Sequence, residues 1–310
     1  MIELQGVGKR YGAVRAVDEV SLTIERGEFV ILIGASGSGK TTLLKMINRL
    51  VEHDEGRILF MGDEIRSFKP EDLRRRMGYA IQSTGLFPHW TVARNVATVP
   101  GLLGWPAARI DARVDELLTL LELKPAEYRT RYPHQLSGGQ QQRVGVARAL
   151  AADPEVLLMD EPFGALDRIT RQSLQQEMAR IHRTSGKTIV LVTHDIEEAL
   201  SLATRIVLLD RGHIVQAGTP AQLLGQPLSP FVSDFMGRDD LGLKLLGLQT
   251  VAARVRAGEH ADGAPVAAAL TLREVLAEFV ARHVDRLPVV DAQGRSLGTI
   301  HFADLLKTPP

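Results

Sequence analysis

FVILIGASGSGKTT, residues 29–42, is the stretch that decides the fold. Its first five residues are apolar, which predicts a short buried strand. A loop rich in glycine and serine follows, and the next residues, LLKMI, continue as a helix. A strand, a glycine-rich loop and a helix in this order fit the phosphate-binding pattern GxxxxGK[ST] in the structural context that the pattern requires. The stretch therefore predicts a nucleotide-binding α/β domain.

Each residue type in this loop has a physical role. Glycines allow backbone N–H groups to approach phosphates without steric conflict, and the following helix adds the positive end of its dipole. Lys40 is predicted to reach the β- and γ-phosphates of ATP, and the hydroxyl of Thr41 to hold Mg²⁺. The residues predicted to bind the nucleotide here are Gly34, Ser36, Gly37, Ser38, Gly39, Lys40, Thr41 and Thr42.

A second element lies at residues 156–162, VLLMDEP. Four apolar residues predict a buried strand, and two carboxylates follow at its carboxyl end, where α/β sheets bind ligands. Asp160 is predicted to complete the Mg²⁺ site, directly or through water. Glu161 is placed to accept a proton from the attacking water. Without the phosphate loop, these acids could equally be a solvated strand end with a helix cap.

Short apolar runs alternate with helical patterns through the first part of the chain, which predicts a parallel sheet covered by helices. Alternating segments at Ile2–Val7, Val20–Ile24 and Arg57–Phe60 predict an additional antiparallel piece. Residues of roughly 91–152 read mostly as helix.

The composition changes near Gly237, where an alanine- and glycine-rich segment begins. We predict a boundary near residues 237–245, with a nucleotide-binding domain at 1–237. Residues 238–265 are predicted to be a linker and the start of a second domain. Residues 266–307 then read as helix, strand, turn, strand and helix.

The overall composition limits the function. Lys+Arg and Asp+Glu number 37 each, and cysteine is absent. The chain has no basic excess of the kind that nucleic-acid binding usually requires. Its apolar runs are strand-length, so we expect a soluble chain that reaches a membrane only through a partner. The histidines show no metal-ligand spacing, and Mg²⁺ is the only metal that the sequence implies.

A third motif gives the family resemblance. Residues 136–140 read LSGGQ, followed by QQR and a helical pattern. This resembles the signature sequence of the ABC ATPases, and the order of all the motifs over residues 1–236 is similar to that family. The resemblance implies an ABC ATPase fold, in which a RecA-like parallel-sheet core carries an antiparallel β subdomain and a helical subdomain. It also implies an ATP-bound homodimer, in which each ATP contacts the signature motif of the other copy.

The resemblance also implies roles for individual residues. Tyr11 is similar to the aromatic residue that stacks on adenine, although it could be an ordinary surface tyrosine. Gln82 resembles a loop glutamine that contacts Mg²⁺ and water and senses the membrane partner, and His194 a switch histidine at the γ-phosphate. Asp167 resembles the residue that couples the two sites. The predicted catalytic residues are Glu161, His194, Gln82 and Lys40. Those predicted to meet the second ATP are Ser137, Gly138, Gly139, Gln140 and Asp167.

Residues 44–58, 74–92 and 131–167 resemble the ATPase subunits of osmoprotectant importers, most of all the Yeh-type systems of bacteria. The implied function is ATP hydrolysis that energises uptake of glycine betaine, choline or a related solute. The implied partners are a permease, which an apolar patch at residues 83–92 would contact, and indirectly an extracytoplasmic binding protein. The implied location is the cytoplasmic face of the bacterial inner membrane. Importers of amino acids or taurine have similar ATPases, and a soluble ABC ATPase without transport function is a more remote alternative.

The end of the chain resembles a single CBS repeat, on the basis of Pro288, Asp291, Gly294, Gly298 and Asp304. CBS repeats usually occur in pairs, whereas this chain carries one convincing copy. The repeat could therefore bind a regulatory ligand or serve only in dimerisation.

Overall fold

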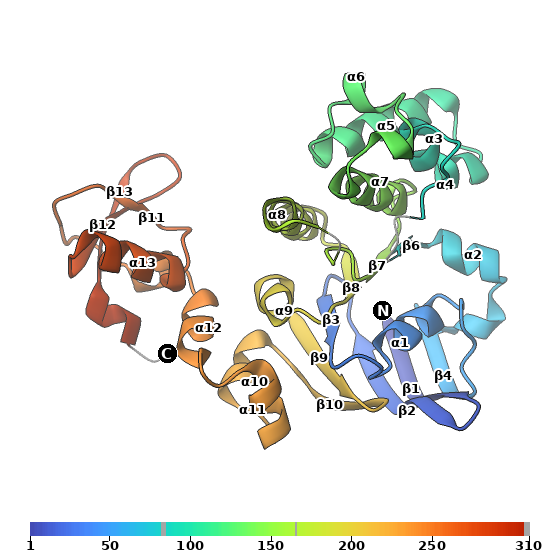
Figure 1. Cartoon of the computed structure of the whole chain (residues 1–310), viewed down its shortest axis with the longest axis horizontal. Helices are drawn as coiled ribbons and strands as arrows, with labels where there is room; N and C mark the ends of the chain where they lie inside the picture. The colour runs from blue at the N-terminus through green and yellow to red at the C-terminus, as the bar shows by residue number, and fades with distance from the viewer. Residues whose placement is uncertain (82–84, 165, 307–310) are drawn as a thin grey trace. The chain divides into compact units, whose positions relative to one another are not determined.

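The computed structural model describes residues 1–81, 85–164 and 166–306. Contacts divide the chain into two compact units, Met1–Thr219 and Pro220–Pro310 (Figure 1). Among the described residues, no helix combines the length and the apolar character that crossing a membrane requires.

The N-terminal unit is built on a six-stranded sheet, in which neighbouring strands are parallel except for one edge pair. The strand order is β10 (His213–Gly218), β9 (Arg205–Asp210), β3 (Phe29–Ile33), β8 (Thr188–Val192), β7 (Val156–Asp160) and β6 (Met77–Ala80). Every residue of β3, β7 and β8 is buried. This explains why these strands read as continuous apolar runs, since helices cover both faces of a parallel sheet.

An antiparallel sheet completes the core of this unit, as the sequence predicted. Its strand order is β2 (Val14–Ile24), β1 (Ile2–Tyr11), β4 (Glu55–Phe60) and β5 (Asp63–Glu64). A short 3₁₀ turn, Ile65–Ser67, and helix α2, Pro70–Arg75, follow it. Side chains of both sheets and of helix α1 (Lys40–Ile47) share one hydrophobic cluster. Helix α1, which begins at the end of the phosphate loop, therefore packs into the core that the two sheets share.

The predicted helical region between residues 91 and 152 is confirmed. It contains α3 (Val92–Val96), α4 (Thr98–Leu102), α5 (Ala107–Leu120), α6 (Pro125–Tyr128), a 3₁₀ turn (Pro133–Gln135) and α7 (Gly138–Leu150). These helices form a group apart from α1 and its loop (Figure 1). Two further helices, α8 (Arg168–Ser185) and α9 (Ile196–Leu202), follow strands β7 and β8.

The C-terminal unit is small and mixed. Its elements are α10 (Pro220–Gly225), α11 (Pro230–Met236), α12 (Leu241–Gly247), a 3₁₀ turn (Val251–Arg254), β11 (Val266–Ala267), α13 (Leu272–Arg282), β12 (Arg286–Val290), β13 (Ser296–His301) and a second 3₁₀ turn (Phe302–Leu306). Strand β12 pairs in parallel with β11 and antiparallel with β13. The helix, strand, turn and strand predicted at 266–301 are present, while the predicted last helix is a 3₁₀ turn.

The structure bears on two sequence expectations about this unit. Contacts separate the units after Thr219 instead of near 237–245, because α10 packs against α11 and α12. Much of the segment 238–265 is also packed structure. Val251 is fully buried, and Leu246 and Val255 pack against the same small core. The packed part of this alanine- and glycine-rich segment lies within the start of the second domain, next to any linker.

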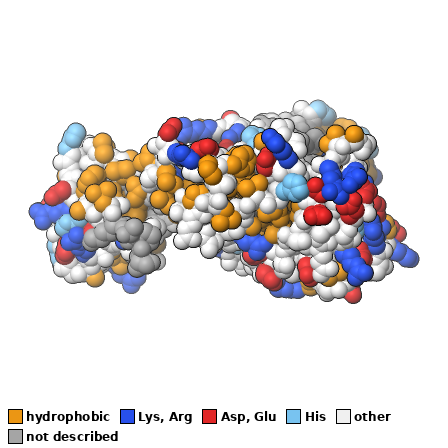
Figure 2. All heavy atoms as spheres, turned by 90° about the horizontal axis from the view of Figure 1, so that it is seen from below, with side chains coloured by type: hydrophobic (Ala, Val, Ile, Leu, Met, Phe, Trp, Pro, Cys, Tyr) orange, Lys and Arg blue, Asp and Glu red, His pale blue; other side chains and the backbone are white. Residues whose placement is uncertain are grey.

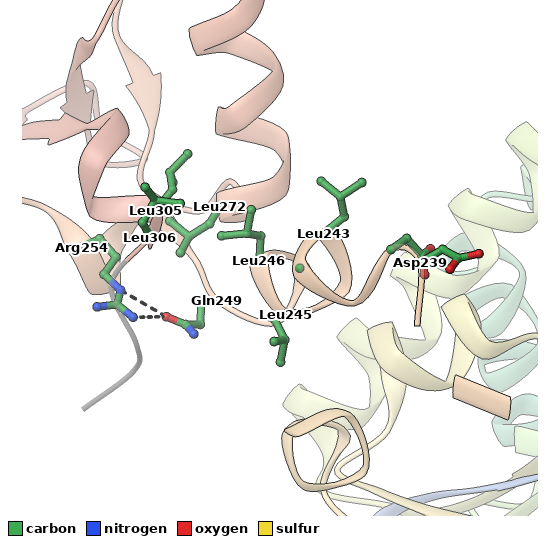
Figure 3. Close-up of a pocket in the computed structure, with 11 residues that line it drawn as sticks. Asp239, Leu243, Leu245, Leu246, Gln249, Arg254, Leu272, Leu305 and Leu306 are labelled. Atoms are coloured by element: carbon green, nitrogen blue, oxygen red, sulfur yellow. Dashed lines mark hydrogen bonds between the residues drawn. The ribbon is translucent and has the colours of Figure 1, made fainter. Parts of the chain in front are cut away.

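The C-terminal unit exposes apolar surface, visible as orange side chains on the left of Figure 2. Val280 is 62% exposed and Leu306 is 83% exposed. The same unit contains a cavity of about 470 Å³, in which Leu246, Leu272 and Leu305 lie near the Arg254–Gln249 hydrogen bond (Figure 3). The predicted CBS residue Asp304 is buried and pairs with the Arg256 guanidinium at 2.8 Å.

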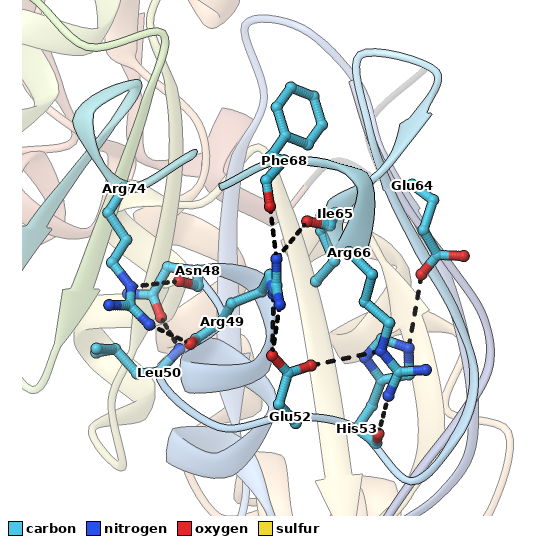
Figure 4. A network of polar contacts seen from close by, with 10 residues as sticks. All are labelled: Asn48, Arg49, Leu50, Glu52, His53, Glu64, Ile65, Arg66, Phe68 and Arg74. Atoms are coloured by element: carbon cyan, nitrogen blue, oxygen red, sulfur yellow. Dashed lines mark hydrogen bonds and ion pairs between the residues drawn. The ribbon is translucent and has the colours of Figure 1, made fainter. Parts of the chain in front are cut away.

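A polar network fixes the loop that follows α1 (Figure 4). The Arg49 guanidinium donates to the carbonyls of Ile65 and Phe68 and pairs with Glu52. His53 lies in this network with only 1% of its surface exposed, and both of its ring nitrogens lack a hydrogen-bond partner. Burial, followed by the positive charge of Arg66, lowers the pKa of His53 below its ordinary value.

We expect His53 to make the N-terminal unit less stable in mild acid. Above the ordinary histidine pKa of about 6.5, His53 is neutral in both the folded and the unfolded chain. Below that pH the unfolded chain takes up a proton that the folded chain resists, so the free energy of unfolding falls. His53→Gln should therefore lose less stability than the wild type between pH 7.5 and pH 5.5.

Denaturant unfolding followed by tryptophan fluorescence measures this, because Trp90 and Trp105 both lie in the N-terminal unit. His134→Gln, at an exposed histidine of the same unit, is the matched control and should keep the wild-type pH dependence. Equal pH dependence in wild type and His53→Gln would contradict the prediction.

Candidate nucleotide site

The phosphate loop joins β3 to α1 and depends on glycine at two tight positions. A Cβ on Gly34 would lie 2.1 Å from the carbonyl oxygen of Leu209, and a Cβ on Gly39 would lie 2.3 Å from that of Ala16. Both glycines also have positive φ angles, 149° and 101°. The neighbouring strands β9 and β2 thus leave no space for a side chain, and the loop backbone stays open toward a ligand.

Lys40 is held inside this loop. Its ammonium donates to the carbonyl oxygens of Gly34 and Ala35 at 2.8 Å each, with a weaker contact to Ser38 Oγ at 3.4 Å. Only 7% of its surface is exposed. Burial lowers the pKa of Lys40, while the carboxylates of Glu161 and Asp160 raise it. Glu161, the predicted catalytic base, and Asp160, the predicted metal ligand, therefore stabilise the positive charge of Lys40.

Thr41 and Asp160 form a compact pair of oxygen ligands. Thr41 Oγ1 donates to Asp160 Oδ1 at 2.9 Å, and Asp160 is 4% exposed. Burial raises the pKa of Asp160, and the hydrogen bond from Thr41 lowers it. A hydroxyl and a carboxylate at the carboxyl end of a strand fit the oxygen ligands that Mg²⁺ prefers. These two residues would hold the ion beside the phosphate loop.

Glu161 and His194 come from neighbouring strand ends. Glu161 Oε1 lies 3.3 Å from His194 Nδ1, and the Glu161 N–H donates to Val192 O at 2.9 Å. Glu161 has a φ of 46°, a left-handed conformation that costs free energy for a residue with a side chain. Backbone strain of this kind often occurs at functional sites. His194 is well exposed, with 67% of its side chain accessible.

The signature residues lie at the start of α7. Ser137 caps this helix: its Oγ accepts from the Gln140 N–H at 3.3 Å, and Gln140 Oε1 accepts from the Ser137 N–H at 2.9 Å. The hydroxyl acts there only as an acceptor, so its proton can be donated to an anion. Ser137 and Gly138 are exposed, and α7 lies apart from α1 in Figure 1. The chain does not bring its own signature motif to its own phosphate loop.

The remaining predicted residues lie as follows. Asp167 caps α8 and accepts from the N–H groups of Ile169 and Thr170 at 3.1 Å each. Tyr11 is half exposed at the end of β1, with the Lys9 ammonium 5.5 Å from its ring centre. Gln82 lies outside the described residues.

The described part of the aromatic patch, residues 85–92, is ordered by one buried amide. Asn95 Nδ2 donates to the carbonyls of Phe87, Trp90 and Thr91, and Asn95 Oδ1 accepts from Phe87 N–H. The rings of Phe87 and Trp90 are 4.4 Å apart. Phe87 is 40% exposed, so an apolar surface remains available there.

Comparison with known sequences shows which protein family contains this site. The pattern of the ABC transporter family matches residues 17–164, and that of the CBS domain matches residues 264–309. The glycine betaine uptake system ATP-binding protein YehX of Escherichia coli (strain K12) is 62% identical over 99% of both chains. The chain belongs to the ATP-binding subunits of the ABC transporters. The predicted family and the predicted fold, an ABC ATPase with a CBS-like C-terminal part, are confirmed.

Other members of this ABC family are also similar. The glycine betaine/carnitine/choline transport ATP-binding protein OpuCA of Bacillus subtilis (strain 168) is 49% identical over 94% of this chain and 76% of its own length. A solved dimeric ATP-binding cassette in a post-hydrolysis state, bound to ADP and Pi, is 34% identical. It superposes with a TM-score of 0.65 over 71% of this chain and 99% of that one. This structural neighbour is therefore a dimer with bound ADP and Pi.

The sequence reasoning missed several residues around this ABC site. A charged cluster next to His194 consists of Arg171, Asp195 and Glu198. Thr193, which lies in the same region, is only 3% exposed. Asn95, which orders the aromatic patch, was also missed. A helix-capping aspartate directly after His194 was visible in the sequence. The sequence did not show that this aspartate pairs with Arg171, 24 residues away, because the contact exists only after α8 and α9 have packed.

Proposed function

We propose that this chain hydrolyses ATP to energise the uptake of an osmoprotectant, such as glycine betaine or choline, through a separate permease. The observation that carries the proposal is the joint placement of Lys40, Asp160, Glu161 and His194 at the carboxyl ends of β3, β7 and β8. Support for the substrate class comes from similarity to uptake subunits whose names specify glycine betaine, choline and carnitine.

The phosphate loop binds the triphosphate. Backbone N–H groups of the loop and the N-terminus of α1 face the phosphate oxygens, and Lys40 supplies a positive charge. Thr41 and Asp160, together with Gln82, would hold Mg²⁺, which when bound neutralises charge on the phosphates. Tyr11 would stack against adenine, where half of its surface is open.

Glu161 acts as the base that accepts a proton from the attacking water. Its carboxylate lies 3.3 Å from the His194 ring, so the histidine can orient the carboxylate and then contact the γ-phosphate. Hydrolysis leaves ADP and inorganic phosphate, and the proton passes to Glu161. The role of the chain is thus to position water and stabilise charge around the phosphate.

A second copy completes each site. The exposed Ser137 hydroxyl and the N-terminus of α7 form an anion-binding end that this chain cannot present to its own nucleotide. In a homodimer, Ser137, Gly138, Gly139 and Gln140 would meet the γ-phosphate bound by the other copy, and Asp167 would lie at the interface. ATP then holds the dimer together, and hydrolysis releases it.

The permease would dock on the aromatic patch near Phe87 and Trp90, which directly follows Gln82 in the sequence. An exposed aromatic surface on an ordered loop suits a short helix from a membrane subunit. This partner places the chain on the cytoplasmic face of the bacterial inner membrane. The extracytoplasmic binding protein would act through the permease without touching this chain.

Transport by the reconstituted complex tests the substrate class. The chain, its permease and its binding protein are placed in vesicles loaded with ATP, and uptake of labelled glycine betaine, choline, taurine and sulfate is compared. We expect ATP-dependent uptake of glycine betaine or choline and none of sulfate. Uptake of only taurine or sulfate would keep the ATPase role and overturn the osmoprotectant assignment.

A further inference from the structure

The first turns of α8 contain an arginine that contacts two functional segments. The Arg171 guanidinium donates from Nη2 to the carbonyl oxygen of Leu166 at 3.3 Å, directly before Asp167. From Nη1 it reaches Asp195 Oδ2 at 3.5 Å, and its Nε lies 4.0 Å from Glu198 Oε1. One side chain therefore contacts both the segment that carries Asp167 and the segment that follows His194.

The residues around His194 are tied into the same cluster. Thr193 Oγ1 donates to Glu198 Oε2 at 2.6 Å and accepts from the Asp195 N–H at 3.1 Å. Asp195 Oδ1 in turn accepts from the N–H groups of Glu197 and Glu198 at the start of α9. The backbone on both sides of His194 is thus fixed by groups that Arg171 holds.

The opposite side of α8 contacts the signature helix. A Cβ on Gly139 would lie 2.7 Å from Thr170 Cγ2, so the start of α7 packs closely against α8 where Gly139 has no side chain. Further along, the Arg143 guanidinium donates to Ser173 Oγ at 3.1 Å. The start of α8 therefore connects the signature motif on one side with the His194 segment on the other.

We propose that Arg171 is a positioning residue that links His194 of one ATP site to the signature and Asp167 segments that serve the other site. This rests on the proposed function, in which His194 contacts the γ-phosphate of its own chain and Ser137 contacts that of the partner copy. A shift of α8 that follows nucleotide binding at the signature motif is then transmitted through Arg171 to Asp195 and Thr193, and so to His194.

The buried members of the cluster make the His194 end of this link stiff, while Arg171 and Asp195 keep 33% and 32% of their side chains exposed. Glu198 is 4% exposed and Thr193 is 3% exposed, so neither group can exchange its partner for water without loss. Arg171 supplies a planar, permanently charged group that can bond several acceptors together, which a lysine cannot reproduce. Removing the guanidinium should leave the phosphate loop intact and free His194 to move relative to Asp167.

The test compares Arg171→Met, Arg171→Lys and the matched control Arg180→Met in the full-length chain. Arg180 lies on the same helix and pairs with Glu177, three residues before it. We expect Arg171→Met to lower kcat about 10- to 100-fold, because displacement of a catalytic group by about 1 Å can cost this much. The affinity of the chain for ATP should stay within twofold, and the Hill coefficient for ATP should fall toward one.

Arg171→Lys should be intermediate, and it remains informative if Arg171→Met folds poorly. A double-mutant cycle on kcat with Asp195→Asn gives a second measure, because residues that act through one another are not additive. Additive effects, or a kcat for Arg171→Met equal to that of Arg180→Met, would overturn the inference. A wild-type chain that hydrolyses no ATP would instead overturn the proposed function, so the two failures are distinguishable.

Discussion

Glu161→Gln should lower kcat for ATP hydrolysis by about 100-fold or more, since a positioned general base contributes about 10²- to 10⁴-fold. The amide keeps the size of the side chain and can still contact His194, which lies 3.3 Å away in the native site. It cannot accept the proton of the attacking water at neutral pH. ATP binding depends on the phosphate loop and should remain within about threefold of wild type, because an interaction used only in the transition state changes kcat and leaves substrate binding nearly unchanged.

The measurements are steady-state phosphate release, ATP binding and size-exclusion chromatography with ATP. Because the dimer dissolves on hydrolysis in our proposal, the variant should accumulate as an ATP-stabilised dimer. Glu71→Gln, at an exposed glutamate in α2, is the matched control and should behave as wild type. Continued turnover by Glu161→Gln would remove Glu161 from the role of base.

Lys40→Met should weaken ATP binding by about 10- to 100-fold, because a charge-assisted hydrogen bond contributes about 1.5–3 kcal/mol. Methionine keeps much of the apolar stem and removes the ammonium, which in the native chain contacts two loop carbonyls at 2.8 Å. Hydrolysis should fall with binding, since little ATP is held at ordinary concentrations.

Isothermal titration of the full-length chain with ATP measures the change. Lys69→Met alters an exposed lysine before α2 and should leave the affinity unchanged. The thermal unfolding of Lys40→Met, followed by tryptophan fluorescence, separates a loss of binding from a loss of folding. An ATP affinity equal to that of Lys69→Met would show that Lys40 does not contact the phosphates.

The sequence predicted the phosphate loop and strand β7 well because both are local. The spacing of glycines and a run of apolar residues can each be read from a few consecutive residues, and the buried strands appear in the sequence as continuous apolar runs. The role assigned to Glu161 also followed from its place after a strand. The left-handed φ of 46° at Glu161 could not be predicted, because that conformation arises from the turn that joins β7 to the segment before α8.

Other features depended on contacts that no local pattern encodes. The sequence analysis made no prediction for His53, which is buried in the structure beside Arg66 and Glu64. The segment 238–265 was predicted to be a linker and the start of a second domain, and the sequence did not show that Val251 is buried in a core supplied by residues up to Leu305. For Val251 the partners extend to residue 305, so only the packed fold brings these groups together.

The three contacts that hold Lys40 have a consequence for the entropy of nucleotide binding. A free lysine side chain has about 2 kcal/mol of rotamer entropy to lose when it is immobilised. Here the carbonyls of Gly34 and Ala35 restrict the ammonium before any ligand arrives. The side-chain entropy of Lys40 is therefore lost when the chain folds and not when ATP binds. A mobile surface lysine would lose that entropy on binding, so its contacts with the phosphates would contribute less to the affinity.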